Sequence, residues 1–194
     1  MDVLNKMEIC DKQSVRKLVA ARQKTYSKAW VEEQSVSIQN QILECEDFKN
    51  ASAIFCYVNF GKEVVTVPII ETALSMGKRV GVPLCLGKGI MDVHEITSLD
   101  QLKPGAYGIL EPDASTPLID VKDIDFGIIP CVSCNKKGER LGHGAGYYDR
   151  YLSKGNFVKA ILCFDEMMEE AIPTDEHDVL MDYVVSQSGM VKIQ

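Results

Sequence analysis

The segment RLGHGAGYYDRYL, residues 140–152, combines a glycine-rich loop with the pattern of an amphipathic helix. Its alternating glycines allow backbone conformations that are closed to other residues and let N–H groups approach an anion: Gly142, Gly144 and Gly146. The aromatic and apolar residues that follow have the spacing of one helix face: Tyr147, Tyr148, Tyr151 and Leu152. A helix N-terminus adds partial positive charge. The segment therefore predicts a phosphate-binding loop that opens a helix.

On both sides of this segment, short apolar runs alternate with helical periodicity. Strands are predicted at residues 53–58, 79–84, 91–96, 124–130, 160–164 and 183–185. Helices are predicted after Asp11, over residues 28–47 following Ser27, and over residues 65–76 up to Gly77. This alternation is typical of a layered α/β domain, in which ligands bind beyond the carboxyl ends of strands.

The size and charge of the chain limit the kinds of protein that it can be. Its 194 residues contain no low-complexity break, which predicts a single domain over residues 1–194. A formal net charge of −7 argues against a general nucleic-acid-binding protein. Neither a leader-like start nor an apolar run of about 18 residues is present. We therefore expect a cytoplasmic protein that binds no membrane.

Seven scattered cysteines fit reduced thiols better than a disulfide framework. The pair Cys131 and Cys134 has the C-x-x-C spacing of half a zinc site or of a redox pair. Neither a second C-x-x-C nor a nearby pair of histidines three to five residues apart accompanies it, so ordinary buried cysteines are the favoured interpretation. Cys56 and Cys163 lie in apolar runs, as small core residues do.

The glycine loop differs from the two best-known phosphate-binding loops. It lacks the Gly-Lys-Ser/Thr ending of a P-loop, and its G-x-G-x-G spacing after a long loop differs from a dinucleotide-binding fingerprint. A tight turn without a ligand remains an alternative for the glycines alone. Arg140 and Asp149 favour a phosphate-binding loop over such a turn, because a guanidinium can bind phosphate oxygens and a carboxylate can hold a metal ion.

Residues 135–149, NKKGERLGHGAGYYD, resemble the signature of the 5-formyltetrahydrofolate cyclo-ligase family. The resemblance extends to Lys12 and Arg16 in the first helix, and to the segments 57–63, 108–112 and 172–182. It implies a single three-layer α/β/α domain with a mostly parallel, mixed sheet. It also implies a monomer or a weak homodimer.

The family resemblance implies a ligase that uses ATP and Mg²⁺ to convert 5-formyltetrahydrofolate to 5,10-methenyltetrahydrofolate, releasing ADP and phosphate. Transfer of the γ-phosphoryl group to the formyl oxygen makes an iminium phosphate that the folate nitrogen N10 attacks. Both reacting groups belong to the substrates, so the protein has to supply positioning and charge neutralisation. This agrees with a sequence that contains neither a Ser-His-Asp nor a Cys-His signature.

The same resemblance implies roles for individual residues. The nucleotide-binding set is Lys12, Arg16, Arg140, Gly142, His143, Gly144, Ala145, Gly146, Tyr148 and Asp149. The folate-binding set is Val58, Glu63, Tyr107 and Tyr147, and the residues implied in catalysis are Arg140 and Tyr147. Asp149 and Asp178 are the implied magnesium ligands, with Asp182 as a weaker third.

Spacing alone leaves simpler alternatives open for several of these residues. Lys12 and Arg16 could belong to a solvated basic helix face, Glu63 could be a surface acid, and residues 175–178 an acidic turn. At the level of function, the alternatives are a non-catalytic folate- or nucleotide-binding relative and an isomerase of sugar phosphates. The isomerase would need a general base and no ATP.

His143 and Ala145 depart from the family pattern, in which many relatives carry arginine or lysine at these positions. The loop therefore brings less fixed positive charge to a phosphate. An unperturbed histidine titrates near neutrality, so we expect ATP binding to weaken as the pH rises through that range.

Overall fold

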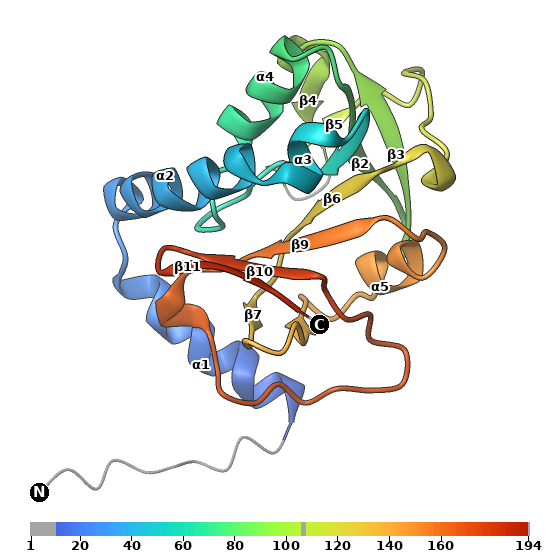
Figure 1. Ribbon diagram of the computed structural model, residues 1–194. Helices are drawn as coiled ribbons and strands as arrows, with labels where there is room; N and C mark the ends of the chain where they lie inside the picture. The colour runs from blue at the N-terminus through green and yellow to red at the C-terminus, as the bar shows by residue number, and fades with distance from the viewer. Residues whose placement is uncertain (1–10, 106–107, 194) are drawn as a thin grey trace, which may run out of the picture.

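A seven-stranded sheet forms the centre of the computed structural model, which describes residues 11–105 and 108–193 (Figure 1). The strand order is β11-β10-β9-β6-β1-β2-β3. Strands β10, β9, β6, β1 and β2 are parallel, and β11 and β3 pair antiparallel at the two edges. The strands are β1 (Ala53–Cys56), β2 (Arg79–Gly87), β3 (Ile90–Ile96), β6 (Phe126–Ile129), β9 (Val158–Leu162), β10 (Tyr183–Ser186) and β11 (Gly189–Lys192). The predicted mostly parallel, mixed sheet is confirmed.

Helices cover both faces of this sheet. In Figure 1, α2, α3 and α4 lie on one side, and α1 and α5 lie on the other. Their bounds are α1 (Lys12–Thr25), α2 (Lys28–Glu44), α3 (Glu46–Asn50), α4 (Val67–Ser75) and α5 (Tyr147–Leu152). Short 3₁₀ turns are η1 (Leu99–Gln101), η3 (Val121–Asp123) and η4 (Asp165–Met167). The three-layer α/β/α architecture is therefore also confirmed.

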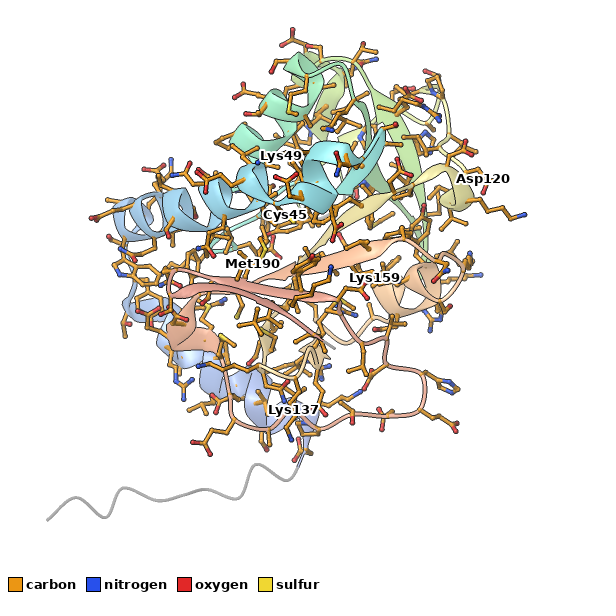
Figure 2. The ribbon with its side chains drawn as sticks, in the orientation of Figure 1. Cys45, Lys49, Asp120, Lys137, Lys159 and Met190 are labelled. Carbon is orange, nitrogen blue, oxygen red and sulfur yellow. The ribbon has the colours of Figure 1, made fainter. Side chains whose placement is uncertain are left out.

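Local sequence accounts for where the first helices begin and end. The Asp11 carboxylate accepts hydrogen bonds from the backbone N–H groups of Gln13 and Ser14, and Ser27 caps α2 in the same manner. The expected single helix over residues 28–47 is wrong, because Cys45 has extended backbone angles (φ −64°, ψ 127°) that separate α2 from α3. Cys45 is labelled at this junction in Figure 2.

The order of the strands creates a switch point between β1 and β6. From β1 the chain passes through α4 to β2 on one side, whereas from β6 it passes through α5 to β9 on the other side. Connections that leave in opposite directions open a crevice at the carboxyl ends of the two strands, where ligands bind in open α/β sheets. The segments after β1 and β6 are therefore the expected location of the site.

Two small ribbons stand apart from the main sheet. One pairs β4 (Leu102–Pro104) with β5 (Leu110–Pro112), and the other pairs β7 (Ser133–Cys134) with β8 (Arg140–Leu141). These ribbons and β11 were not predicted from the sequence. The β7–β8 ribbon matters most for the site, because it leads directly from the end of β6 into the glycine loop.

Apolar side chains from the sheet and from both helical layers form one buried cluster. Phe55 and Ile128, from the neighbouring strands β1 and β6, are fully buried in it. Among the described residues, none of the helices combines the length and the apolar character needed to cross a membrane.

Candidate nucleotide and folate site

The glycine loop lies between β8 and α5, and each of its glycines has a local structural reason. Gly144 (φ +102°) and Gly146 (φ +70°) have positive φ angles that strain other residues. A Cβ atom at Gly142 would lie 2.8 Å from Nη1 of Arg140. The loop opens a helix as predicted, although α5 has only six residues and its dipole contribution is correspondingly small.

Arg140 is the most buried charged residue of this site, with 5% of its surface exposed. Its Nη2 lies 2.5 Å from Oδ1 of Asp149, and its Nη1 donates a hydrogen bond to the backbone oxygen of Pro130 at 3.3 Å. The guanidinium carbon lies 5.8 Å from the centroid of the Tyr148 ring. The buried Nε has no hydrogen-bond partner among the described residues. Arg140 thus has donor capacity beyond its protein contacts.

The first helix brings two more cations to the glycine loop. Nζ of Lys12 lies 2.6 Å from Asp178 and 2.7 Å from Asp175, and Nε of Arg16 donates to the backbone oxygen of Gly142 at 2.8 Å. In Figure 1, the connection of residues 168–182 passes the N-terminal end of α1. The alternative of a fully solvated basic face therefore does not hold for Lys12 and Arg16, which are both half-buried.

These groups surround a cleft of about 700 Å³. Its lining includes eight of the residues proposed for nucleotide or metal: Lys12, Arg16, Arg140, Gly142, Gly144, Gly146, Asp149 and Asp178. They come from α1, from the β8–α5 segment and from the connection that precedes β10, so the fold joins both ends of the chain at one site. A cleft of this size can hold a nucleotide.

The two candidate metal ligands share the cleft, and the third does not. Burial raises the pKa of Asp178, but hydrogen bonds from Lys12 and from the Asp175 backbone outweigh this effect and lower the pKa overall. Asp178 is therefore ionised at neutral pH. Asp182 instead accepts a hydrogen bond from the backbone N–H of Lys159 on β9 at 2.7 Å, outside the cleft lining (Figure 2 labels Lys159).

Glu63 lies in the turn after β1, close to the end of β6. Its Oε2 accepts a hydrogen bond from the backbone N–H of Phe60 at 2.8 Å. Burial raises its pKa to about 7. Its carboxylate in turn raises the pKa of Tyr57 and Tyr148, although burial is the larger cause for both phenols. Glu63 is thus a half-buried acid beside Tyr148, and not an ordinary surface glutamate.

The remaining predicted residues that the structure describes do not belong to the cleft lining. Tyr148 stacks on Phe55 with ring centroids 6.0 Å apart, and Tyr147 also packs against the core. Val58 is 4% exposed, within the apolar core. Ala145 is exposed, and its backbone oxygen accepts a hydrogen bond from Arg150. Tyr107 falls outside the described residues.

His143 is exposed on the loop, and its environment opposes protonation. Partial burial of the ring is the largest cause of a lowered pKa, and the neighbouring charges of Arg140 and Arg16 act in the same direction. The His143 ring therefore titrates at a lower pH than the near-neutral range expected from the sequence. At neutral pH the ring is uncharged and can contribute a hydrogen bond but no fixed charge.

Three charged residues of the cleft lining were not among the predicted site residues: Arg150, Asp175 and Glu176. Arg150 lines it and donates from Nη1 to the backbone oxygens of Gly89 and Ala145, at 3.0 and 3.1 Å. Asp175 lines it as well and shares Lys12 with Asp178. Arg150 directly follows Asp149, and Asp175 lies three positions before Asp178, but only the fold shows that they line the same cleft.

Comparison with known proteins identifies the family of the chain. The model of the 5-formyltetrahydrofolate cyclo-ligase family matches residues 8–187. A Schizosaccharomyces pombe protein named probable 5-formyltetrahydrofolate cyclo-ligase is 31% identical over 179 residues, covering 84% of this chain and 88% of the relative. An Arabidopsis thaliana relative, named as a mitochondrial 5-formyltetrahydrofolate cyclo-ligase, is 28% identical over 210 residues, covering 94% of this chain and 76% of its own.

A solved structure shares the fold over nearly the whole chain. The NMR structure of Aquifex aeolicus 5,10-methenyltetrahydrofolate synthetase has a TM-score of 0.84 and 26% sequence identity, covering 94% of this chain and 93% of the other. One identification agrees with the glycine loop, with the cations of α1 beside it and with the family match over residues 8–187. This chain is an enzyme that belongs to the 5-formyltetrahydrofolate cyclo-ligase family.

Proposed function

We propose that this chain, acting as a single domain, closes 5-formyltetrahydrofolate to 5,10-methenyltetrahydrofolate and converts ATP to ADP and phosphate in the same reaction. The family to which it belongs implies this ATP-dependent conversion. The observation that carries the proposal is the convergence of Lys12, Arg16 and Arg140 on one cleft beside the glycine loop. Three cations from two distant segments fit a polyphosphate better than they fit a neutral ligand.

The reaction needs activation of a formyl oxygen, which is a poor leaving group. Transfer of the γ-phosphoryl group breaks its bond to the β-phosphate oxygen and forms a bond to the formyl oxygen, which gives an iminium phosphate. N10 of the folate then attacks the formyl carbon and loses its proton, and phosphate leaves with the former formyl oxygen. Catalysis of such a transfer depends on alignment and on stabilisation of the moving negative charge.

The cleft supplies that stabilisation. Lys12 and Arg16 are proposed to hold the phosphates from α1, and Arg140 to hold them from the opposite wall, with N–H groups of the glycine loop, His143 and Ala145 adding donors. Asp149 and Asp178 are proposed to hold Mg²⁺, which prefers a few carboxylates together with water and phosphate oxygens. The ionised state of Asp178 supports this role. Bound Mg²⁺ would neutralise phosphate charge during transfer.

Folate is proposed to bind next to Glu63, at the carboxyl end of β1. A half-buried carboxylate accepts paired hydrogen bonds from the N–H groups of a pterin well. Tyr147 and Tyr148, which follow the glycine loop, are proposed to lie where nucleotide and folate meet, with Val58 and Tyr107 as apolar walls. The proximity of Glu63 and Tyr148 supports this arrangement, because it joins the acid to the phosphate loop.

We also propose that the protein is cytoplasmic, because its described cysteines are free thiols of the kind that a reducing compartment maintains, and that it acts as a monomer or a weak homodimer. A non-catalytic folate-binding protein is the second candidate. The full set of cations and acids in one cleft favours the enzyme, because binding without phosphoryl transfer needs no metal-binding acids.

A labelling experiment tests the proposed route. The chain would be given ATP, Mg²⁺ and 5-formyltetrahydrofolate that carries ¹⁸O in the formyl group. The proposal predicts methenyl product together with phosphate that contains the label. Product with unlabelled phosphate would contradict the phosphoryl-transfer step, and absence of product would favour the non-catalytic binding protein.

A further inference from the structure

The two cysteines of the C-x-x-C pair and a third cysteine from a distant part of the sequence meet near the carboxyl ends of β6 and β9. Cys131 follows Pro130 after β6, Cys134 ends β7, and Cys163 follows β9 directly. Their Sγ atoms all lie within 4.8 Å of one another. The C-x-x-C pair was the only part of this group that the sequence could suggest, because Cys163 joins it through the parallel pairing of β6 with β9.

The geometry points to a binding site for one thiophilic metal ion, of the Zn²⁺ class, formed by Cys131, Cys134 and Cys163. Zn–S bonds are about 2.3 Å long, so sulfurs bound to one tetrahedral zinc lie about 3.8 Å apart. The present separations of at most 4.8 Å therefore need only small side-chain rotations to reach this distance. Soft thiolate ligands favour zinc and copper(I) over magnesium or calcium.

The three thiols lie close enough to shift one another's pKa values. Hydrogen bonds from the Cys134 and Cys163 thiols lower the pKa of Cys131, and they outweigh its burial, with a further contribution from Arg140. The same contacts and burial raise the pKa of Cys163. When a cation binds, the thiols still protonated release their protons to solvent, so each sulfur becomes a thiolate ligand.

Access to the cluster is from the side of Cys131. Cys134 and Cys163 are 0% and 3% exposed, whereas Cys131 is half-buried. Three protein ligands leave the fourth position of a tetrahedral ion for water, as in zinc sites that keep one position open. Bound Zn²⁺ with three thiolates has a net charge of −1, and the nearby guanidinium of Arg140 offsets it.

The cluster also lies against the ribbon that carries Arg140. Cys134 on β7 pairs with Arg140 on β8, and Nη1 of Arg140 donates to the oxygen of Pro130, which precedes Cys131. A cation bound to the three sulfurs would therefore stabilise the β7–β8 ribbon, which carries Arg140 and leads into the glycine loop. The metal proposed here is distinct from Mg²⁺, whose carboxylate ligands line the cleft, and its binding does not depend on the proposed reaction.

The test uses Co²⁺ as a coloured substitute for Zn²⁺ on the reduced full-length chain, without ATP or folate. The expected result is one equivalent of Co²⁺ with sulfur-to-cobalt charge-transfer absorption and tetrahedral d–d bands, which Zn²⁺ abolishes by displacement. Zn²⁺ should also raise the melting temperature, because an ion that binds only the folded state stabilises it. Wild-type protein without charge-transfer absorption would overturn the proposal.

Matched serine variants locate the site. Cys131→Ser and Cys163→Ser should each lose the charge-transfer absorption and the Zn²⁺-dependent rise in melting temperature. Cys85→Ser, which changes a half-buried thiol on β2, should keep both. Circular dichroism of each variant checks the fold, and Cys131→Ser is informative even if the buried Cys163→Ser fails to fold. Unchanged absorption in folded Cys131→Ser would contradict the site.

Discussion

Arg140 and Asp149 form an ion pair across the glycine loop, with Nη2 and Oδ1 2.5 Å apart. The arginine side chain is 3% exposed and the aspartate side chain 23%, so the pair joins the buried ribbon to the first turn of α5. In the proposed enzyme, the arginine contacts phosphate and the aspartate contacts magnesium. The ion pair therefore holds the proposed phosphate-binding and magnesium-binding groups next to each other.

Asp149→Asn is expected to lower turnover on the order of 10- to 100-fold, mainly through ATP and Mg²⁺. The amide keeps a hydrogen bond to Arg140 but loses the charge that a metal ion requires. Steady-state kinetics at varied ATP and Mg²⁺ measure the effect. The matched control is Asp182→Asn, which changes an aspartate outside the cleft lining and should leave kcat and both KM values unchanged. Equal losses in the two variants would remove Asp149 from the metal site.

Lys12→Met is expected to raise the KM for ATP by about 10- to 100-fold, the effect of losing one charge-assisted contact. The methionine retains most of the side-chain volume, so the packing of α1 is preserved. Lys17→Met, on the exposed face of the same helix, serves as the control and should leave the KM unchanged. If both variants weaken ATP binding equally, α1 contributes only general positive charge.

Glu63→Gln is expected to stabilise the protein at neutral and alkaline pH. The carboxyl has a raised pKa of about 7 in the folded chain against 4.5 normally, so the folded state binds more protons between these values. By linkage, the free energy of unfolding of the wild type then falls as the pH rises from about 4.5 to 7, by up to about 3 kcal/mol. The glutamine variant lacks this loss.

Denaturant unfolding at a series of pH values measures this difference in stability between Glu63→Gln and the wild type. It should grow as the pH approaches 7 and level off above that value. Glu71→Gln, at an exposed position of α4, should show no such trend. A difference that is constant with pH would show that Glu63 does not titrate differently in the folded and unfolded states.

The same carboxyl predicts a pH dependence of folate binding. An ionised Glu63 accepts hydrogen bonds from the pterin, so the KM for 5-formyltetrahydrofolate should fall as the pH rises through about 7. Glu63→Gln should raise this KM and flatten its pH profile, while the KM for ATP stays close to that of the wild type. A wild-type folate KM that is flat between pH 6 and 8 would contradict the assigned role.

The charge of His143 should strengthen ATP binding only at acidic pH. Because its pKa is lowered by partial burial and by Arg140 and Arg16, the ring gains a charge below the usual histidine range and is neutral above it. We expect the wild type and His143→Gln to have parallel ATP KM profiles above pH 6.5 and to diverge below it. A step in the wild-type profile near pH 7 that disappears in His143→Gln would show that the ring is charged at neutrality.

The parts of the fold that follow from local patterns were predictable. Apolar runs located the central strands, and Asp11 and Ser27 located the starts of α1 and α2. The break at Cys45 was not predictable, because helical spacing continues on both sides of it and backbone angles decide where the chain turns. Strand β11 was missed, although it forms a local hairpin with β10 in which Ser186 pairs with Gly189, because its four residues lack an apolar run and none of them is buried.

The site was predictable as far as residues are adjacent in sequence or belong to the family signature. Arg140 and Asp149 lie nine positions apart, and the signature contains both. The pairing of Lys12 with Asp178 spans 166 positions, so only the fold could show that the two side chains touch. The three-cysteine cluster was also not predictable, because Cys163 belongs to no sequence motif with the C-x-x-C pair that it joins in the fold.

The most direct measurement of the central claim follows methenyl absorption and ADP release together, with purified chain, Mg²⁺ and 5-formyltetrahydrofolate in the presence and absence of ATP. We predict that methenyl product and ADP form in equal amounts, and that neither forms without ATP. Methenyl product that forms at the same rate without ATP, or ADP release with no methenyl product, would contradict the assignment of the cleft to ATP-driven ring closure.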